Sequence, residues 1–377
     1  MKFLHTGDLH IGKIVNDFSM LEDQRHILEQ IYQFALREQV DAVIVAGDVY
    51  DRAIPPAEAV LLFNDFLTKL EQAKIPVLMI SGNHDSPERV SFAARILENR
   101  HIYISGICDR PLKRVYFQDE YGEVTFVLLP FVKPAVVGAK TNGEAVERLL
   151  GEEKLEEGRK VLITHYFVTD AGKTPELCEG ETTVHVGGLD NVEASLFSDF
   201  DYVALGHIHK PQKIGQGDNY YAGAPLAYSF SEAGQEKSVN LVELKEKGRL
   251  SVTRLPLSPL HQMRRIRGRL EELMAVQVVE AADAGDYIRA ELTNEEELID
   301  PIGTLRTVYP NVMQIVMLKN EKRETSSYTS RCIERKKDVC LLFQEFYHML
   351  RGEEPDAQRM ELIQEVAREA QHEEMRS

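Results

Sequence analysis

The sequence predicts an α/β protein: a four-layer α/β/β/α sandwich over residues 1–258, a small α+β domain over 259–320, and a linker with a helical tail over 321–377. In the first hundred residues, short apolar strands alternate with amphipathic helices, the βαβ pattern of a doubly wound sheet. Beyond residue 102, strand-like runs dominate, which predicts a second sheet. Several apolar strands run directly into Asp, Asn and His residues, a pattern that packing alone does not explain.

Apolar periodicity places the elements of the large domain. We expect helices at 20–39, 56–70 and 87–97, where Pro55, Pro56 and Pro87 suit helix starts. We expect strands at 2–6, 42–46, 76–80, 115–117, 124–129, 220–222, 239–243 and 250–255, and further apolar runs lead into His165 and His207. These segments supply enough apolar residues for two sheets with helices outside them.

The small domain is predicted to begin after the prolines at positions 256 and 259. It contains strands at 262–269, 287–292 and 313–318, with helices at 271–282 and 301–308 between them. A polar link follows at 319–330, and its composition separates this domain from the tail.

Composition limits the class of protein. The net charge of −17, from 44 basic and 61 acidic residues, argues against a general nucleic-acid coat, although the acidic residues concentrate in a few segments. Four cysteines without C-x-x-C spacing argue against a structural zinc site or a disulfide framework and favour a reducing cytoplasm. No apolar run approaches the roughly 18 residues of a membrane span, and the candidate site begins at Asp8, too early for a cleaved leader.

The polar residues at the strand ends form a candidate metal site. The proposed ligands are Asp8, His10, Asp48, Asn83, His165, His207 and His209, and His84, Asp51 and Arg52 lie beside them in sequence. Carboxylate, imidazole and amide oxygen together suit a divalent ion such as Mn²⁺. Seven ligands are too many for one ion and about right for two, and Asp48 is the natural bridge because its strand lies between the others in sequence.

The same residues resemble five motifs of the calcineurin-like metallophosphoesterases. These motifs are Asp8-Leu9-His10, Gly47-Asp48-Val49-Tyr50-Asp51-Arg52, Gly82-Asn83-His84-Asp85, His165, and Gly206-His207-Ile208-His209. Within that superfamily the chain is similar to the bacterial SbcD family of nuclease subunits. This likeness rests on Phe3-Leu4-His5-Thr6-Gly7-Asp8, Ser86-Pro87-Glu88-Arg89, Tyr221-Ala222-Gly223-Ala224-Pro225-Leu226 and Ser229-Phe230-Ser231-Glu232-Ala233.

The resemblance implies a nuclease with two Mn²⁺, or other divalent ions, that cuts DNA together with the SbcC ATPase in repair, recombination and replication. It implies exonuclease action on double-stranded ends, endonuclease action on single strands or hairpins, and a cytoplasmic, nucleoid-associated protein. One ion would take Asp8, His10, Asp48 and His209, and the other Asp48, Asn83, His165 and His207. His84 would stay off the metal ions and face the leaving oxygen.

Three residues near these motifs leave alternatives open. Archaeal relatives carry His where this chain has Asp51, and an Asp here can act as a carboxylate that orients His84 and favours its protonated form. Arg52 suits a phosphate contact or a structural ion pair. Asp85 suits support of its loop or capping of the helix near Pro87.

Two rival functions use the same residues. A phosphomonoesterase or small phosphodiesterase can share the metal site, but the long segments after residue 258 argue against a minimal phosphatase. A DNA-binding scaffold with a dead site is the other alternative, and the intact ligand set argues against it.

Three further segments suggest interaction surfaces. Surplus apolar residues on the helices at 56–70 and 87–97 (Leu61, Leu62, Phe63, Phe66, Phe92 and Ile96) suggest a homodimer, or else these helices only cover the sheet. The arginines at 264, 265, 267 and 269 suit DNA contact or ion pairs between domains. In the tail, Val339, Leu342, Phe343, Phe346, Tyr347 and Leu350 form a helical apolar stripe that predicts SbcC binding, against the alternative of a tail docked on its own small domain.

Overall fold

The computed structural model describes residues 1–153, 157–178 and 191–318, together with residues 347, 355–356 and 359–360. The chain divides into two compact units, 1–318 and 319–377, and the folded domains described below belong to the first. Apart from Tyr347, the predicted SbcC-binding stripe lies outside the described residues. The predicted domain boundaries at residues 258 and 320 stay predictions.

The first sheet has six strands in the order β16, β15, β1, β4, β5, β6. Their bounds are Leu250–Pro256 (β16), Ser238–Leu244 (β15), Lys2–Thr6 (β1), Ala42–Ala46 (β4), Val77–Ile80 (β5) and Ile102–Ser105 (β6). β1, β4, β5 and β6 pair in parallel, so they all end at the same edge of the sheet. β15 and β16 return to this sheet as an antiparallel extension beside β1, which gives β1 a partner on its otherwise open side.

The second sheet also has six strands, in the order β13, β14, β12, β9, β8, β7. Their bounds are Gln212–Ile214 (β13), Asn219–Tyr221 (β14), Tyr202–Gly206 (β12), Arg159–His165 (β9), Gly122–Leu129 (β8) and Lys113–Asp119 (β7). β8, β9, β12 and β14 are parallel, and β7 and β8, which contain the strands predicted at 115–117 and 124–129, pair antiparallel. This sheet therefore also gathers strand carboxyl ends at one edge.

The two sheets pack face to face, because residues alternate between the two sides of each strand. In β4, Ile44 faces a core shared with Ile163 of β9, whereas Val43 and Val45 face the other way. Val43 and Val45 share a second core with Ile27 on helix α1 (Leu21–Arg37).

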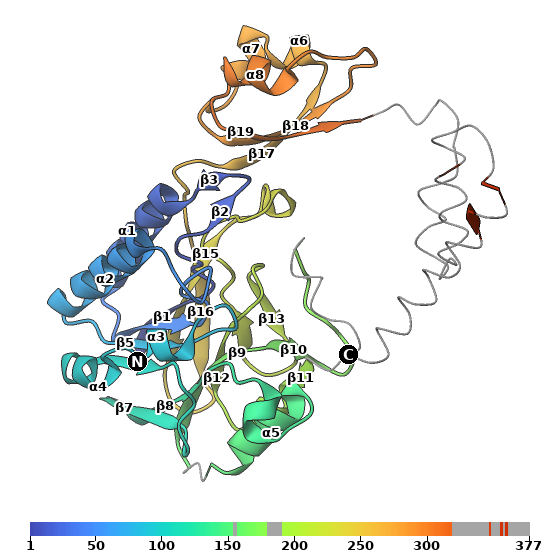
Figure 1. Ribbon diagram of the computed structural model, residues 1–377. Helices are drawn as coiled ribbons and strands as arrows, with labels where there is room; N and C mark the ends of the chain where they lie inside the picture. Colours follow the sequence, from blue (N-terminus) through green and yellow to red (C-terminus); the bar gives the residue numbers. More distant parts are fainter. Residues whose placement is uncertain (154–156, 179–190, 319–346, 348–354, 357–358, 361–377) are drawn as a thin grey trace. The chain divides into compact units, whose positions relative to one another are not determined.

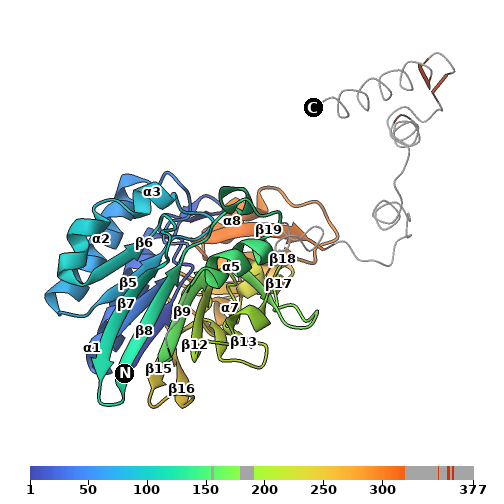
Figure 2. The ribbon, with the colours of Figure 1, turned by 90° about the horizontal axis from the view of Figure 1, so that it is seen from below.

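Helices form the outer layers. α1 and α2 (Ala57–Gln72) cover the first sheet, and α5 (Asn142–Gly151) covers the second through Val146 and Leu149 (Figures 1 and 2). The predicted four-layer α/β/β/α sandwich is confirmed.

One predicted helix is interrupted. In place of a single helix at 87–97, the chain forms α3 (Pro87–Val90) and α4 (Ala94–Leu97), because Ala93 has a left-handed backbone with φ of 59°. Ser86 caps α3 by accepting a hydrogen bond from the Arg89 amide at 3.4 Å. Among the described residues of this domain, the remaining short elements are β2 (Ile14–Val15), β3 (Phe18–Ser19), β10 (Phe167–Thr169), β11 (Asn191–Glu193), η1 (Glu98–Arg100), η2 (Pro134–Val137), η4 (Ala194–Phe197) and η5 (Phe230–Glu232).

The small domain has a parallel sheet of β17 (Met263–Gly268), β18 (Tyr287–Leu292) and β19 (Val312–Met317), with α6 (Leu270–Leu273), α7 (Val276–Val279) and α8 (Pro301–Arg306). Its core includes Leu273, Ile288, Leu305 and Tyr309. The single helix predicted at 271–282 is wrong: the backbone is extended at Ala275, and α7 that follows is rich in valine, a weak helix former.

Specific contacts join the small domain to the sandwich. Asp23 on α1 is buried and accepts hydrogen bonds from the His261 amide at 2.9 Å and the Tyr287 hydroxyl at 2.7 Å. Arg265 donates to the carbonyl of Phe230 at 2.8 Å. Arg264 pairs with Asp286 at 2.6 Å. The Arg264 ion pair lies within the small domain, and Arg265 joins the two domains through a hydrogen bond, so neither contact is the ion pair between domains that the sequence offered as an alternative to DNA contact.

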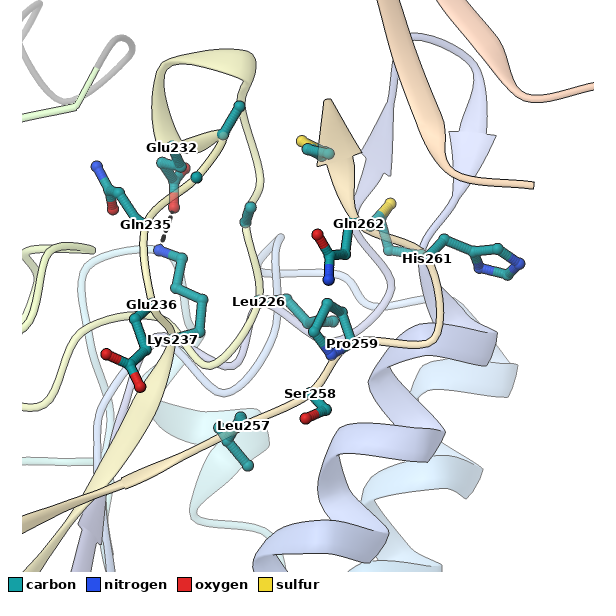
Figure 3. A pocket seen from close by; sticks show the side chains of 15 residues that line it. Leu226, Glu232, Gln235, Glu236, Lys237, Leu257, Ser258, Pro259, His261 and Gln262 are labelled. Atoms are coloured by element: carbon teal, nitrogen blue, oxygen red, sulfur yellow. Dashed lines mark hydrogen bonds and ion pairs between the residues drawn. The ribbon is translucent and has the colours of Figure 1, made fainter. Parts of the chain in front are cut away.

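A cavity of about 280 Å³ lies at this junction (Figure 3). The loop around Glu232 and Lys237 lines it on one side, and the segment from Leu257 to Met263 lines it on the other.

Within the described part of the chain, no helix is both long and apolar enough to cross a membrane.

Candidate metal centre

Five strands from the two sheets deliver the predicted ligands to one place. β1 leads to Asp8 and His10, β4 to Asp48, and β5 to Asn83, all from the first sheet. β9 ends at His165, and β12 leads to the two remaining histidines, His207 and His209. Because the strands of each sheet are parallel to one another, their carboxyl ends lie at one edge of that sheet, where ligand sites of α/β sheets form. The two edges meet here, since His165 contacts both Asn83 and Asp48.

The backbone at these strand ends is held in an uncommon conformation. Asp8, His10, Asp48 and His207 have positive φ angles of 50°, 43°, 47° and 100°. Hydrogen bonds tie the first two loops together: the Asp8 amide donates to the Gly47 carbonyl at 3.1 Å, and the His10 amide donates to the Asp48 carbonyl at 3.0 Å. Such strained conformations cost about 1–3 kcal/mol each and cluster at functional sites, so they support a functional centre here.

Two glycines let the loops approach the site. A Cβ on Gly82 would lie 2.1 Å from Asp48 Oδ1, and a Cβ on Gly47 would lie 2.4 Å from His165 Nδ1. Both distances are far below van der Waals contact. Any side chain at either glycine would therefore displace a predicted ligand.

Asp48 lies at the centre of the cluster. Its Oδ1 accepts a hydrogen bond from the His84 amide at 2.8 Å, and its Oδ2 lies 3.2 Å from His165 Nε2 and 3.8 Å from His10 Nε2. Burial opposes ionisation, but the positive charge of His165 outweighs it and lowers the pKa of Asp48. The carboxylate is therefore ionised and placed between both groups of ligands.

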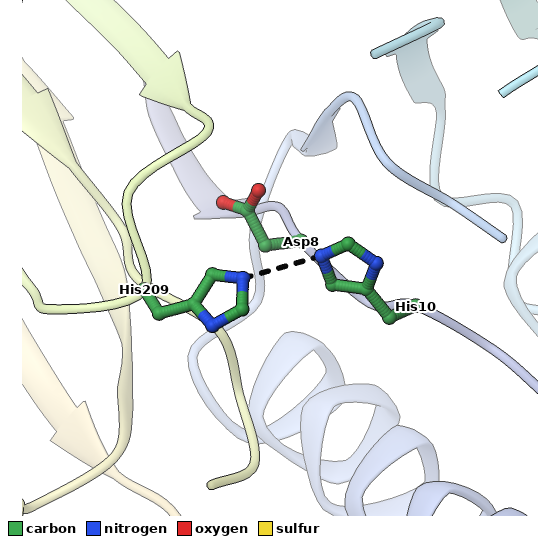
Figure 4. A group of neighbouring side chains, drawn as sticks. All are labelled: Asp8, His10 and His209. Carbon is green, nitrogen blue, oxygen red and sulfur yellow. Dashed lines mark hydrogen bonds between the residues drawn. The ribbon is translucent and has the colours of Figure 1, made fainter. Parts of the chain in front are cut away.

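Asp8, His10 and His209 form one group (Figure 4). The Nε2 atoms of His10 and His209 lie 3.2 Å apart, so at most one of them carries a proton directed at the other. Both oxygens of Asp8 accept from the His207 amide, at 2.9 and 3.0 Å. Burial, partly offset by His165 and His209, raises the pKa of Asp8 to about 6.

His165, Asn83 and His207 form the second group. The Nδ1 atom of His165 lies 2.8 Å from the Ala46 carbonyl, which can only accept, so Nδ1 carries a proton. The Nε2 atom lies 3.0 Å from Asn83 Oδ1 and 3.2 Å from Asp48 Oδ2. His207 Nδ1 lies 3.0 Å from the same Asn83 oxygen.

The atoms around His165 Nε2 indicate whether a cation can bind at this position. A neutral imidazole with its proton on Nδ1 would direct an Nε2 lone pair at two oxygen atoms, which is repulsive. Although burial lowers the pKa of His165, the neighbouring Asp48 raises it to about 9, so a second proton occupies this position in the metal-free chain. A divalent cation can replace that proton, and the group therefore fits a metal ion.

Clusters of three ligands overlap at this site. They are Asp8, His10 and His209; Asp8, Asp48 and His165; and His10, Asp48 and His84, with the ligand atoms of each within 4.8 Å of one another. Carboxylates and imidazoles in this combination suit a divalent transition metal.

The family comparisons cover nearly the whole chain. Residues 1–211 match the calcineurin-like phosphoesterase family, and residues 259–351 match the family described as the type 5 capsule protein repressor C-terminal domain. The SbcD subunit of the nuclease SbcCD from Staphylococcus epidermidis is 31% identical over 357 residues, which cover 92% of each chain. The chain belongs to the SbcD family of calcineurin-like phosphoesterases.

Solved structures also resemble this SbcD-family chain. A dimetal phosphatase from Danio rerio matches with a TM-score of 0.40 and 13% identity, covering 68% of this chain and 99% of its own. A protein of Thermus thermophilus matches with a TM-score of 0.38 and 15% identity, covering 67% and 98%.

Asp51 contacts His84 in a way that the sequence did not predict. The Asp51 main-chain carbonyl, not the carboxylate, lies 3.1 Å from His84 Nδ1. The carboxylate instead pairs with Lys13 at 2.6 Å and lies 3.6 Å from the guanidinium of Arg52. Because the carbonyl can only accept, it keeps a proton on His84 Nδ1.

The Arg52 side chain is 72% exposed, so its ion pair leaves most of it open to solvent and to a phosphate.

Asp85 supports the loop, as one of its two predicted roles required. Its carboxylate accepts hydrogen bonds from the amides of Val49, Tyr50 and Gly82 at 3.1, 3.0 and 2.9 Å. Burial and the charge of Asp48 raise the pKa of Asp85 to about 6. This residue therefore fixes the loop after β4 against the loop after β5.

Sequence reasoning missed two buried polar residues beside the SbcD-family site. Gln24 on α1 donates to the His10 carbonyl at 2.7 Å. Glu232 lies 3.4 Å from His209 Nδ1 and pairs with Lys237. The Ser-Phe-Ser-Glu run at 229–232 was part of the family resemblance, but nothing local to it indicates contact with a histidine some twenty residues away.

Proposed function

We propose that this chain is the metal-dependent nuclease subunit of an SbcCD-type complex, a phosphodiester hydrolase that acts on DNA with two Mn²⁺. The observation that carries the proposal is the convergence of the predicted ligands from five strand ends around the ionised Asp48. The kinship with a protein named as part of the nuclease SbcCD supports DNA as the substrate.

The two groups of side chains support a division of the ligands between two ions. Asp8, His10 and His209 would hold one ion, and Asn83, His165 and His207 the other, with Asp48 shared between them. When bound, such a pair of ions stabilises the negative charge that develops on a phosphate and supplies a hydroxide-like nucleophile at neutral pH.

His84, Asp51 and Arg52 would serve the substrate. The Asp51 carbonyl accepts from His84 Nδ1, so a proton for the leaving oxygen would come from Nε2 of this exposed side chain in its doubly protonated form. The exposed guanidinium of Arg52 can contact a phosphate beside the scissile one.

We propose exonuclease action on duplex ends and endonuclease action on single strands or hairpins, in DNA repair and recombination.

The test is incubation of the full chain with Mn²⁺ and three labelled DNAs, a blunt duplex, a hairpin and a single strand, beside a chromogenic phosphate monoester. We expect cleavage of DNA that EDTA abolishes, with much slower turnover of the monoester. Rapid monoester hydrolysis with intact DNA would indicate a phosphatase instead. DNA binding without cleavage of either substrate would indicate a scaffold.

The proposed protein partner is the SbcC ATPase, which we assign to the apolar stripe from Val339 to Leu350. Most of this stripe lies outside the described residues, so the assignment rests on its helical spacing and on the relative named as part of SbcCD. Deletion of residues 338–377 should abolish co-purification of SbcC while Mn²⁺ binding persists. Undiminished association of the shortened chain would place the interface elsewhere.

We also propose a homodimer formed through α2 and the α3–α4 segment. Of the surplus apolar residues, Leu62, Phe63 and Phe66 are buried, but Leu61, Phe92 and Ile96 are 62%, 82% and 72% exposed. Sedimentation of the full chain at micromolar concentration should show a dimer that Phe92→Ser and Ile96→Ser together convert to a monomer. A wild-type chain that sediments only as a monomer would mean that these helices merely cover the sheet.

A further inference from the structure

Glu232 is a buried carboxylate next to the metal centre without belonging to the proposed ligand set. Its side chain is 1% exposed, and Oε1 lies 3.4 Å from His209 Nδ1. The same oxygen accepts from the Tyr228 amide and the Ser229 hydroxyl, both at 3.2 Å. These contacts fix the carboxylate itself, so it can act as a rigid acceptor for the histidine.

Lys237 completes the arrangement from the other side. Its ammonium lies 2.5 Å from Glu232 Oε2, and its side chain is 5% exposed (Figure 3). It also donates to the main-chain carbonyl of His209 at 3.1 Å. The pair therefore holds both the ring and the backbone of one proposed ligand.

We propose that Glu232 and Lys237 are positioning residues that fix His209 with its proton on Nδ1 and its Nε2 atom directed at the metal. This inference rests on the proposed function, because it assumes that the cluster binds a divalent cation. Glu232 would be a carboxylate outside the proposed ligand set that orients one of the ligands, and Lys237 would be its counter-ion.

The Glu232 carboxylate determines which ring nitrogen of His209 carries the proton. An ionised carboxylate accepts only, so the ring nitrogen facing Glu232 must donate. The opposite nitrogen, Nε2, faces His10 Nε2 at 3.2 Å and lies on the side of Asp8 (Figure 4). Histidine ligands of metals are commonly oriented by a carboxylate on the far nitrogen, and loss of that partner costs about 10–100-fold in metal affinity.

The location of the pair argues against a merely space-filling role. Glu232 and Lys237 line the junction cavity of about 280 Å³, so their side chains leave space at the junction unfilled. The short helical turn η5 that contains Glu232 is held by Arg265 of β17 through the Phe230 carbonyl at 2.8 Å. The small domain thus braces the loop that positions His209.

The experiment compares Mn²⁺ affinity, measured by calorimetry on the full chain, for Glu232→Gln and for a matched control, Glu236→Gln. Glu236 is exposed on the same loop and undergoes the same chemical change. We expect Glu232→Gln to weaken one of the two Mn²⁺ sites by about 10–100-fold and Glu236→Gln to leave both unchanged. Nitrogen NMR of labelled histidine in the metal-free protein should show one imidazole leaving the Nδ1-protonated form only in Glu232→Gln.

Glu232→Gln leaves Lys237 buried without its counter-ion and can fail to fold for that reason. The double variant Glu232→Gln, Lys237→Met removes both charges at similar volume and should keep the metal-free unfolding temperature near wild type. Its Mn²⁺ affinity should still fall by the same factor. Wild-type affinity in the folded double variant would overturn the inference, whereas a wild-type chain that binds no Mn²⁺ would overturn the proposed function instead.

Discussion

Asp48→Ala should lose both metal ions and all detectable DNA cleavage. The Asp48 carboxylate lies within reach of both ligand groups, at 3.2 Å from His165 and 3.8 Å from His10. Its removal would take a proposed ligand from each ion and also the charge that raises the pKa of His165 to about 9. We expect Mn²⁺ affinity to fall by more than about 100-fold, beyond the range for loss of an outer-shell partner.

Elemental analysis after dialysis in Mn²⁺ measures this directly. Asp199→Ala is the matched control, because Asp199 is exposed and precedes the amino end of β12, whereas the metal centre lies beyond the carboxyl ends of the strands. The control should retain the metal content and activity of the wild type. An Asp48→Ala chain that still held two ions would show that this carboxylate is not the bridge.

His84→Ala should lose most DNA cleavage but keep its metal. The Asp48 carboxylate is held by the main-chain amide of His84 at 2.8 Å, and this contact survives when the imidazole is removed. The imidazole itself is exposed, and the Asp51 carbonyl orients it through Nδ1. Loss of a general acid typically costs about 10²–10⁴-fold in rate.

Cleavage rate and metal content must be measured on the same preparation of His84→Ala. His26→Ala, which changes an exposed histidine on α1, should match the wild type in both measurements. Because His84 is accessible to solvent, added imidazole should restore part of the lost rate. A metal-depleted His84→Ala chain would instead make His84 a ligand, a role compatible with its place in a cluster with His10 and Asp48.

The local pattern of the sequence determined the candidate site because strand ends and ligands are adjacent in the chain. Asp8, Asp48 and Asn83 each follow an apolar strand of the first sheet within three residues, and parallel pairing brings these ends to one edge, while His165 ends a strand of the second sheet in the same way. Short apolar runs and the helical spacing of apolar residues likewise predicted the two sheets and the outer helices. The candidate ligands and the strands and helices could both be predicted from patterns that span only a few residues.

Only the tertiary structure decided features that depend on distant neighbours. β15 and β16 lie in the first sheet because β1 has an open side there, and Asp51 contacts His84 through its carbonyl while its carboxylate pairs with Lys13. Glu232 reaches His209 because the loop at 228–237 folds back against the segment that follows β12. The sequence shows which groups can donate, accept or carry charge, but partners separated by tens of residues are selected by packing and by competition among charges.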